Sequence, residues 1–115
     1  MKKIRYTPDA ADKLRNISKK LILQHGSSKA KEIIRRIMKT VRELSVNEKL
    51  GPSVEEMFHI PSDYRYVYVS RNYIFYKVEQ EYVQIINLYN EKEDFLRLLF
   101  GIDTTLQETL DYWKE

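Results

Sequence analysis

The sequence predicts an α+β fold in which an antiparallel helical hairpin packs on an antiparallel β-sheet. Apolar residues recur at helical spacing through residues 8–44, with a break at Gly26, and three apolar, tyrosine-rich runs follow residue 62. A short alternating segment at the N-terminus adds a first strand before the helices. Two amphipathic helices alone leave one side of the pair uncovered, so we expect a sheet beneath them.

The first strand and the first helix are predicted from the N-terminal residues. Residues 2–6 alternate between the two faces of a short strand. In Thr7-Pro8-Asp9 the threonine can cap the free amides, the proline suits the first helical position, and the aspartate suits the positive helix end. Gly26 predicts the end of this helix because glycine accepts positive φ. The apolar positions of the helix are Ala10, Leu14, Ile17 and Leu21.

The second helix has the most regular apolar spacing in the chain. We expect Ser27 or Ser28 to cap its N-terminus, because hydroxyl side chains satisfy free helix amides. The very short connection between the two helices predicts an antiparallel hairpin. The apolar positions recur every three or four residues and are Ala30, Ile33, Ile34, Ile37, Met38, Val41 and Leu44.

The sheet is predicted from residue 64 onward, after a connecting segment over 45–62 that contains Gly51-Pro52 and a possible helical turn at 53–58. Three strand-forming runs are joined by very short turns, which predicts a three-strand antiparallel meander. In the last run we expect simple alternation between the two faces. The strands are 64–69, 73–79 and 82–89, the turns are 70–72 and 80–81, and the alternating sets are Val83, Ile85, Asn87 and Tyr89 against Gln84, Ile86 and Leu88.

A short helix over 91–101 is predicted to end the domain at Gly101, with Phe95, Leu98, Leu99 and Phe100 as its apolar residues. The chain of 115 residues predicts one domain, 1–101, followed by a helical extension over 102–115. In that extension Asp103-Thr104-Thr105 can cap a helix that carries Leu106, Leu110 and Trp113.

The composition limits the chemistry of the protein. Cysteine is absent, which excludes disulfides, thiolate zinc sites and cysteine nucleophiles. The only histidines, His25 and His59, are far apart in sequence and form no metal signature, so we expect neither metal nor cofactor. No stretch resembles a signal peptide or a membrane span, so we expect a cytoplasmic protein.

The charges are distributed unevenly along the chain. Residues 1–42 hold 13 Lys and Arg against 3 Asp and Glu, a net charge of +10, whereas residues 43–115 have a net charge of −7. Such asymmetry can indicate a surface for an acidic partner or for nucleic acid, and it is equally typical of a solvated helix face.

The order strand–helix–helix–strand–strand–strand resembles the RelE/ParE superfamily of toxins from bacterial type II toxin–antitoxin modules. Local patterns agree with that superfamily: Thr7-Pro8-Asp9-Ala10 at the first helix, Gly51-Pro52, and Asn90 to Asp94 before Phe95-Leu96. The resemblance covers residues 2–100. It implies a growth-inhibiting toxin of a plasmid stabilisation module, neutralised by a cognate antitoxin and able to form a hetero-oligomer with it.

The superfamily divides by target, and the resemblance implies two mechanisms for this chain. ParE-like members inhibit DNA gyrase, whereas RelE-like members are metal-independent endoribonucleases that cut mRNA on the ribosome. Many nuclease members have cationic or histidine residues at the positions of Ile74, Asn90 and Glu91 in this chain. Their absence favours inhibition of gyrase as the mechanism. If the chain is a nuclease, the expected catalytic residues are Arg65, Arg71, Tyr89 and Lys92, with Tyr89 a proton donor only if its pKa is lowered. An inactive member that only binds antitoxin is the third alternative.

The antitoxin is expected to contact the basic face of the second helix. Antitoxin tails are often acidic, and the positively charged half of the chain would attract one in a salt-dependent manner. The expected binding residues are Lys31, Arg35, Arg36, Lys39 and Arg42, although the same residues also fit a solvated face. The tyrosines of the meander could stack on bases or pair across strands.

Overall fold

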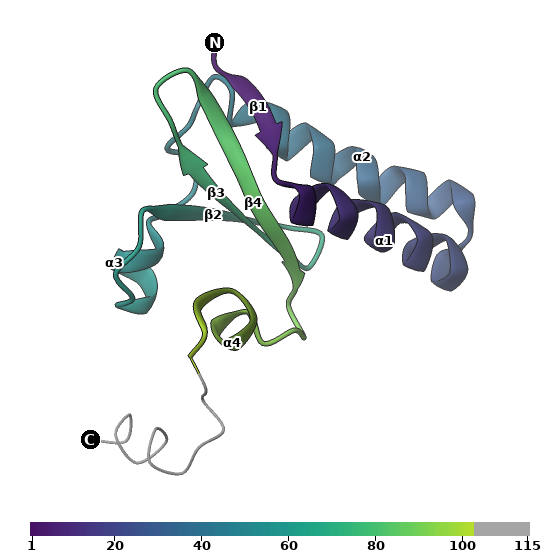
Figure 1. The fold of residues 1–115 in the computed structure, drawn as a ribbon. Helices are drawn as coiled ribbons and strands as arrows, with labels where there is room; N and C mark the ends of the chain where they lie inside the picture. The colour runs from purple at the N-terminus through teal and green to yellow at the C-terminus, as the bar shows by residue number, and fades with distance from the viewer. Residues whose placement is uncertain (103–115) are drawn as a thin grey trace.

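The structure is a computed structural model of the chain, and it describes residues 1–102. The eight elements occur in the predicted order (Figure 1). The helix predicted after Asp103 lies outside the described residues. The elements are β1 (Lys3–Tyr6), α1 (Pro8–His25), α2 (Ser27–Glu43), α3 (Val54–Phe58), β2 (Tyr64–Val69), β3 (Asn72–Val78), β4 (Tyr82–Asn90) and α4 (Phe95–Phe100).

The four strands form one sheet in the order β1-β4-β3-β2. The meander of β2, β3 and β4 is antiparallel, as predicted, but β1 pairs with β4 in parallel, so the prediction of a wholly antiparallel sheet was wrong. Tight turns fix the direction of neighbouring strands. The direction of β1 depends instead on where the helices leave the sheet, which no local pattern in the sequence specifies.

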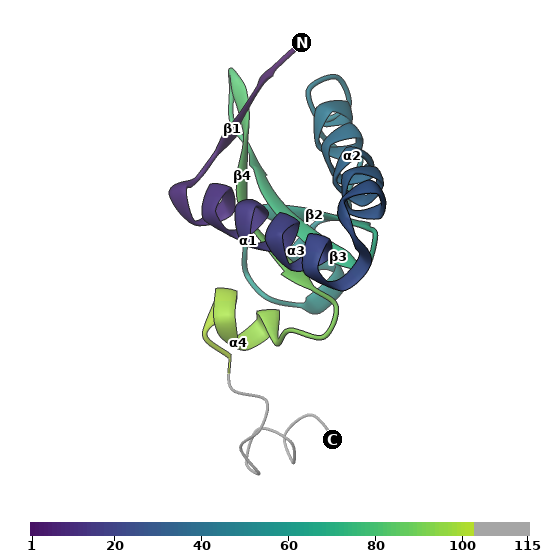
Figure 2. The ribbon, with the colours of Figure 1, turned by 90° about the vertical axis from the view of Figure 1, so that its right-hand side faces the viewer.

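Each face of the sheet has its own hydrophobic cluster. The hairpin of α1 and α2 covers one face, while α3 and α4 lie at the other, as Figure 1 shows and Figure 2 confirms with the hairpin turned toward the viewer. The buried residues on the hairpin side are Ala10, Ile37, Val41, Leu44, Val67, Ile74, Tyr76, Val83, Ile85 and Leu88. On the other face Val54, Phe75 and Tyr89 are buried, and the surrounding residues are largely aromatic.

A β-bulge in β4 decides which of its residues face each cluster. Phe75 pairs with Asn87 but Tyr76 pairs with Ile85, so β4 has one extra residue at this point. Leu88 therefore joins Ile85 on the hairpin side, and Tyr89 moves to the aromatic face. The predicted simple alternation along this strand was wrong, because a bulge shifts every later side chain to the opposite face.

The helix ends follow the predicted pattern at Thr7 but not at the start of α2. The Thr7 hydroxyl accepts a hydrogen bond from the Ala10 amide and donates one to the Ile86 carbonyl, so this residue caps α1 and holds it to β4. Gly26, with φ of 83°, ends α1 and is also the N-cap of α2. The prediction of a serine cap was wrong, because α2 already begins at Ser27 and leaves no position for a separate cap.

The helix after β4 is shorter than predicted. The predicted helix over 91–101 begins only at Phe95, because Asp94 is its N-cap and accepts a hydrogen bond from the Arg97 amide. Gly101, with φ of 71°, ends this helix as predicted. The predicted turn at 53–58 is the helix α3, capped by Ser53. Both short helices lie at the aromatic face and cover much of it.

Candidate functional site

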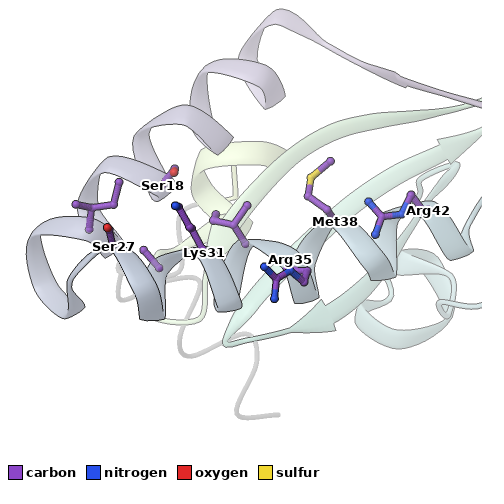
Figure 3. A pocket seen from close by; sticks show the side chains of 9 residues that line it. Ser18, Ser27, Lys31, Arg35, Met38 and Arg42 are labelled. Atoms are coloured by element: carbon purple, nitrogen blue, oxygen red, sulfur yellow. The ribbon is translucent and has the colours of Figure 1, made fainter.

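An open groove of about 370 Å³ lies between α1 and α2 and contains three of the predicted binding residues. Lys31, Arg35 and Arg42 project from α2 along the groove, and Figure 3 shows them with Ser18 of α1 on the other side. The apolar part of the lining consists of Ile22, Ala30, Ile34 and Met38. The groove therefore combines an apolar surface with a row of positive charges.

The helical period of α2 produces this arrangement. Side chains three or four positions apart lie on the same side of a helix. The buried stripe of Ala30, Ile37 and Val41 packs toward the core, and the neighbouring stripe, which begins at Lys31 and ends at Arg42, lines the groove. The alternation of apolar and basic residues in the sequence thus places a cationic stripe directly beside the core.

The five predicted binding residues divide into two groups in the structure. Lys31, Arg35 and Arg42 line the groove. Arg36 donates a hydrogen bond to Glu32 at 2.6 Å on the exposed surface of α2, and Lys39 is exposed on α2 but does not line the groove. The sequence could not make this division, because all five residues are polar positions of one amphipathic helix.

A second, more polar hollow extends the groove toward the hairpin tip. It is lined by Ser27, Ser28, Lys31, Glu32 and Arg35, three of which also line the first groove. At the same tip the last turn of α1 exposes Leu23 to 87% and Ile22 to 47%. The surface offered by the hairpin is therefore apolar as well as basic.

Met38 and Ile22 are groove residues that the sequence analysis did not single out as such. Met38 was expected in the core stripe, but it is only half-buried. Its Sδ accepts a hydrogen bond from the Tyr6 hydroxyl at 3.8 Å. Burial raises the pKa of Tyr6, while the nearby charge of Arg42 lowers it. The signal for Ile22 was the run Leu21-Ile22-Leu23, which one buried helix face cannot accommodate.

Arg65 holds the connecting segment rather than facing an open surface. Its Nη1 donates to the Gly51 carbonyl at 2.7 Å. Directly across the strands, the buried Tyr76 hydroxyl donates to the Glu48 carbonyl and accepts the Gly51 amide. Arg65 thus belongs to a hydrogen-bond network that anchors residues 48–51 against β2 and β3.

Arg71 and Lys92 lie near each other at the opposite end of the sheet. Arg71 is in the two-residue turn between β2 and β3, where Ser70 and Arg71 both have positive φ, as a type I′ turn requires. The Arg71 carbonyl accepts the Glu91 amide at 2.8 Å, which brings the segment containing Lys92 alongside. Four strand residues separate this turn from Arg65, roughly 17 Å along β2, so these cations do not form one group.

Tyr68 and Glu91 also contribute to this end of the sheet, although the sequence did not indicate Tyr68. The Tyr68 hydroxyl donates to Glu91, whose other oxygen lies 3.9 Å from Arg71 Nε. The hydrogen bond to Glu91 raises the pKa of Tyr68, and burial and the negative charge of Glu91 add to it. Glu91 is thus held by Tyr68 and placed beside the cation of Arg71.

Tyr89 lies inside the aromatic cluster and is only 5% exposed. Burial raises its pKa; a hydrogen bond from Asn87 lowers it, and the charges of Glu93 and Asp9 raise it further. The net shift is upward. A proton donor at neutral pH requires a shift in the opposite direction, so the condition set for a catalytic Tyr89 is not met.

Glu93 ties the start of the C-terminal segment to α1. It accepts Lys13 Nζ at 2.5 Å and the Asn90 amide at 3.0 Å. Partial burial raises the pKa of Glu93, but the hydrogen bonds from Lys13 and Asn90 and the charges of Lys13 and Lys20 outweigh it, so the pKa lies below its ordinary value.

The lowered pKa of Glu93 predicts a pH-dependent contribution to stability. A carboxylate with a lower pKa in the folded state stabilises the fold above its unfolded pKa, and this contribution is lost as the pH falls through the folded pKa. We expect Glu93→Gln to lower the free energy of unfolding at pH 7 by at most about 1 kcal/mol, because the pair is partly exposed. We also expect the variant to lose less stability than the wild type between pH 6 and pH 3.

Urea unfolding at several pH values tests this expectation, with Glu55→Gln on the exposed surface of α3 as the control. An unchanged pH dependence in Glu93→Gln would mean that the contact with Lys13 does not contribute to stability in solution.

Neither a metal-binding group nor a membrane span is found in residues 1–102. No three His, Asp or Glu side chains of this part are grouped to hold a metal ion. Its helices are all too short or too polar to cross a membrane.

The chain is similar to a known toxin family. Residues 4–95 match the family model described as the ParE toxin of the type II toxin–antitoxin system parDE. A solved structure, the chromosomal ParDE TA system from P. aeruginosa, superposes with a TM-score of 0.65 at 20% identity and covers 78% of this chain and 96% of that one. At this identity the likeness concerns the fold alone. No individually curated protein shows significant similarity to the chain.

Proposed function

Because the chain belongs to the ParE toxin family of type II toxin–antitoxin systems, we propose that it is a growth-inhibiting toxin that acts on DNA gyrase. The family match carries the proposal: residues 4–95 extend from β1 to the first residue of α4 and therefore include the groove and all of the sheet except Lys3. The proposed setting is the cytoplasm of a bacterium, where a toxin–antitoxin module stabilises a plasmid or another genetic element.

We further propose that the cognate antitoxin occupies the groove between α1 and α2. The positive charges of Lys31, Arg35 and Arg42 suit an acidic chain, and the apolar lining around Ile34 and Met38 suits apolar side chains between the acidic ones. Electrostatic attraction of this kind speeds association and weakens as salt screens it.

Reversing two groove charges is expected to weaken antitoxin binding at least tenfold. In Lys31→Glu/Arg35→Glu both attractive contacts become repulsive. Loss of a single desolvated charge pair already lowers the affinity roughly tenfold. The matched control is Arg36→Glu/Lys39→Glu, which changes the net charge equally on the same helix but outside the groove. Titration of the purified chain with its antitoxin, at low and at high salt, measures both effects.

Equal weakening by both double variants would indicate general charge attraction and no groove site. Retention of wild-type affinity by Lys31→Glu/Arg35→Glu would place the antitoxin elsewhere. Affinity that does not fall with salt would remove the electrostatic part of the proposal.

The geometry of the expected catalytic residues argues against the nuclease alternative. Arg65 is engaged with the Gly51 carbonyl, Tyr89 is buried with a raised pKa, and Arg71 lies far along the strand from Arg65. Arg71 and Lys92, which do lie near each other, share their end of the sheet with the carboxylate of Glu91. The negative charge of this carboxylate disfavours binding of an RNA phosphate.

Induction of the chain alone in a bacterial culture tests the toxin proposal. We expect growth arrest with filamentous cells, because inhibition of gyrase damages DNA and blocks division. Short, static cells would indicate inhibition of translation and support the nuclease alternative. Unimpaired growth at verified soluble expression would support an inactive member that only binds antitoxin. A supercoiling assay with purified gyrase then tests the target directly.

A further inference from the structure

One part of the sheet surface carries cations and a tyrosine that lie outside both hydrophobic clusters. Side chains alternate along each strand, and those that point away from the hairpin at the β1–β4 end are Lys3, Arg5, Lys77, Tyr82 and Gln84. We call this set the open sheet face. Among residues 1–102, none of the five belongs to either hydrophobic cluster.

The strand register places these residues in two adjacent rows. Arg5 pairs with Gln84, Gln84 with Lys77, and Lys77 with Tyr64, so one row crosses all four strands. The next row contains Lys3 and its partner Tyr82. Residues from opposite ends of the sequence, β1 and the meander, therefore build one continuous surface that neither part has alone.

The side chains of the open sheet face are arranged for stacking and for binding anions. The Arg5 guanidinium lies 4.4 Å from the ring centroid of Tyr82, which holds both planar groups at the surface. Lys77 Nζ lies 3.4 Å from Glu79 Oε1, and the exposed Glu81 directly precedes Tyr82. Three cations against these two carboxylates (+3 − 2) leave this face with a net charge of +1.

We propose that the open sheet face binds single-stranded nucleic acid, independently of the hairpin groove. Arg and Lys side chains contact phosphates, tyrosine rings stack on bases, and the Gln84 amide can donate and accept hydrogen bonds at a base edge. Only an unpaired strand can present the faces and edges of its bases to side chains on a sheet. The open sheet face spans β1, β4 and β3, about 10 Å, because the fourth member of the long row, Tyr64, belongs to the aromatic cluster. This width suits about two nucleotides.

The expected salt dependence follows from the number of cations. Three phosphate contacts on a single strand give a slope of about −2 for log K against log salt. Removing two of the three cations in Arg5→Ala/Lys77→Ala is expected to lower the slope to about −0.7 and the affinity at least tenfold at low salt. Tyr82→Leu is expected to lower affinity about tenfold with little change in slope, because it removes stacking and no charge.

The experiment is fluorescence anisotropy of a labelled twelve-nucleotide mixed-sequence strand, as DNA and as RNA, titrated with the purified full chain. The matched control is Lys31→Ala/Arg35→Ala, which removes the same charge from the groove on the hairpin and should keep affinity within twofold. Thermal unfolding verifies that each variant folds. Lys3→Ala/Lys77→Ala is a second double variant that leaves the contact between Arg5 and Tyr82 intact.

Three results would overturn the proposal. The first is no binding of the single strand at 50 mM salt, and the second is equal weakening by the groove control, which would show attraction to general positive charge. The third is binding of the matching duplex as tightly as the single strand, or displacement of the labelled strand by polyglutamate as readily as by unlabelled strand. Either outcome would show that base stacking contributes nothing to binding. None of these results depends on whether the chain arrests growth.

Discussion

Gly51→Ala is expected to lower the free energy of unfolding by at least about 3 kcal/mol. A methyl group at this position would overlap the Tyr66 carbonyl oxygen, lie 2.6 Å from the carbonyl carbon and lie 3.0 Å from Val67 Cγ1. The first two are backbone atoms of β2, which cannot rotate away as a side chain can. The connecting segment must therefore shift, and the hydrogen bonds of Gly51 with Tyr76 and Arg65 are lost.

Urea unfolding of both glycine variants measures this effect, with Gly26→Ala as the matched control. Gly26 has φ of 83° and ψ of 164° but nothing within 4 Å of an added methyl group, so the control should lose only about 1–3 kcal/mol, all of it from backbone strain. A loss no greater at Gly51 than at Gly26 would contradict the close approach of residue 51 to β2.

Phe75→Ala is expected to cost about 3–5 kcal/mol, because it removes the central ring of the aromatic cluster. Phe75 is completely buried, and its ring lies within about 6.4 Å, between centroids, of the rings of Tyr66, Tyr73, Tyr89, Phe95 and Phe100. Two of these neighbours belong to α4. The substitution is therefore expected to loosen α4 as well as to lower overall stability.

Leu98→Ala on the exposed side of α4 is the control for Phe75→Ala and should change stability by no more than about 1 kcal/mol. Near-ultraviolet circular dichroism reports the ordering of the aromatic rings, and hydrogen exchange of α4 amides reports its attachment. Unchanged exchange in Phe75→Ala would show that α4 is held by contacts outside this cluster, such as that between Glu93 and Lys13.

The aromatic cluster also explains the abundance of tyrosine in the meander. Tyr64, Tyr66, Tyr68 and Tyr73 take part in ring contacts with each other or with Phe75, Phe95 and Phe100. These contacts favour cross-strand pairing as the main role of the meander tyrosines. Tyr82 differs from them because it is outside this cluster and the Arg5 guanidinium lies over its ring.

Local chemistry in the sequence determined the helices, the strands and most of their ends. Thr7-Pro8-Asp9 marks the start of α1, Gly26 its end, and the spacing of Ile37, Val41 and Leu44 defines the buried side of α2. These signals are readable because capping, positive φ and helical periodicity involve residues only a few positions apart. The charge difference between the two halves is fixed by composition in the same way.

Only the tertiary structure decided which of these residues meet. The parallel pairing of β1 with β4, the bulge that moves Tyr89 to the aromatic face, and the position of Arg65 against Gly51 all join segments distant in sequence. The same holds for the division of the basic residues of α2 into a groove set and an exposed set. Such contacts depend on the packing of whole elements, whose geometry no local sequence pattern contains.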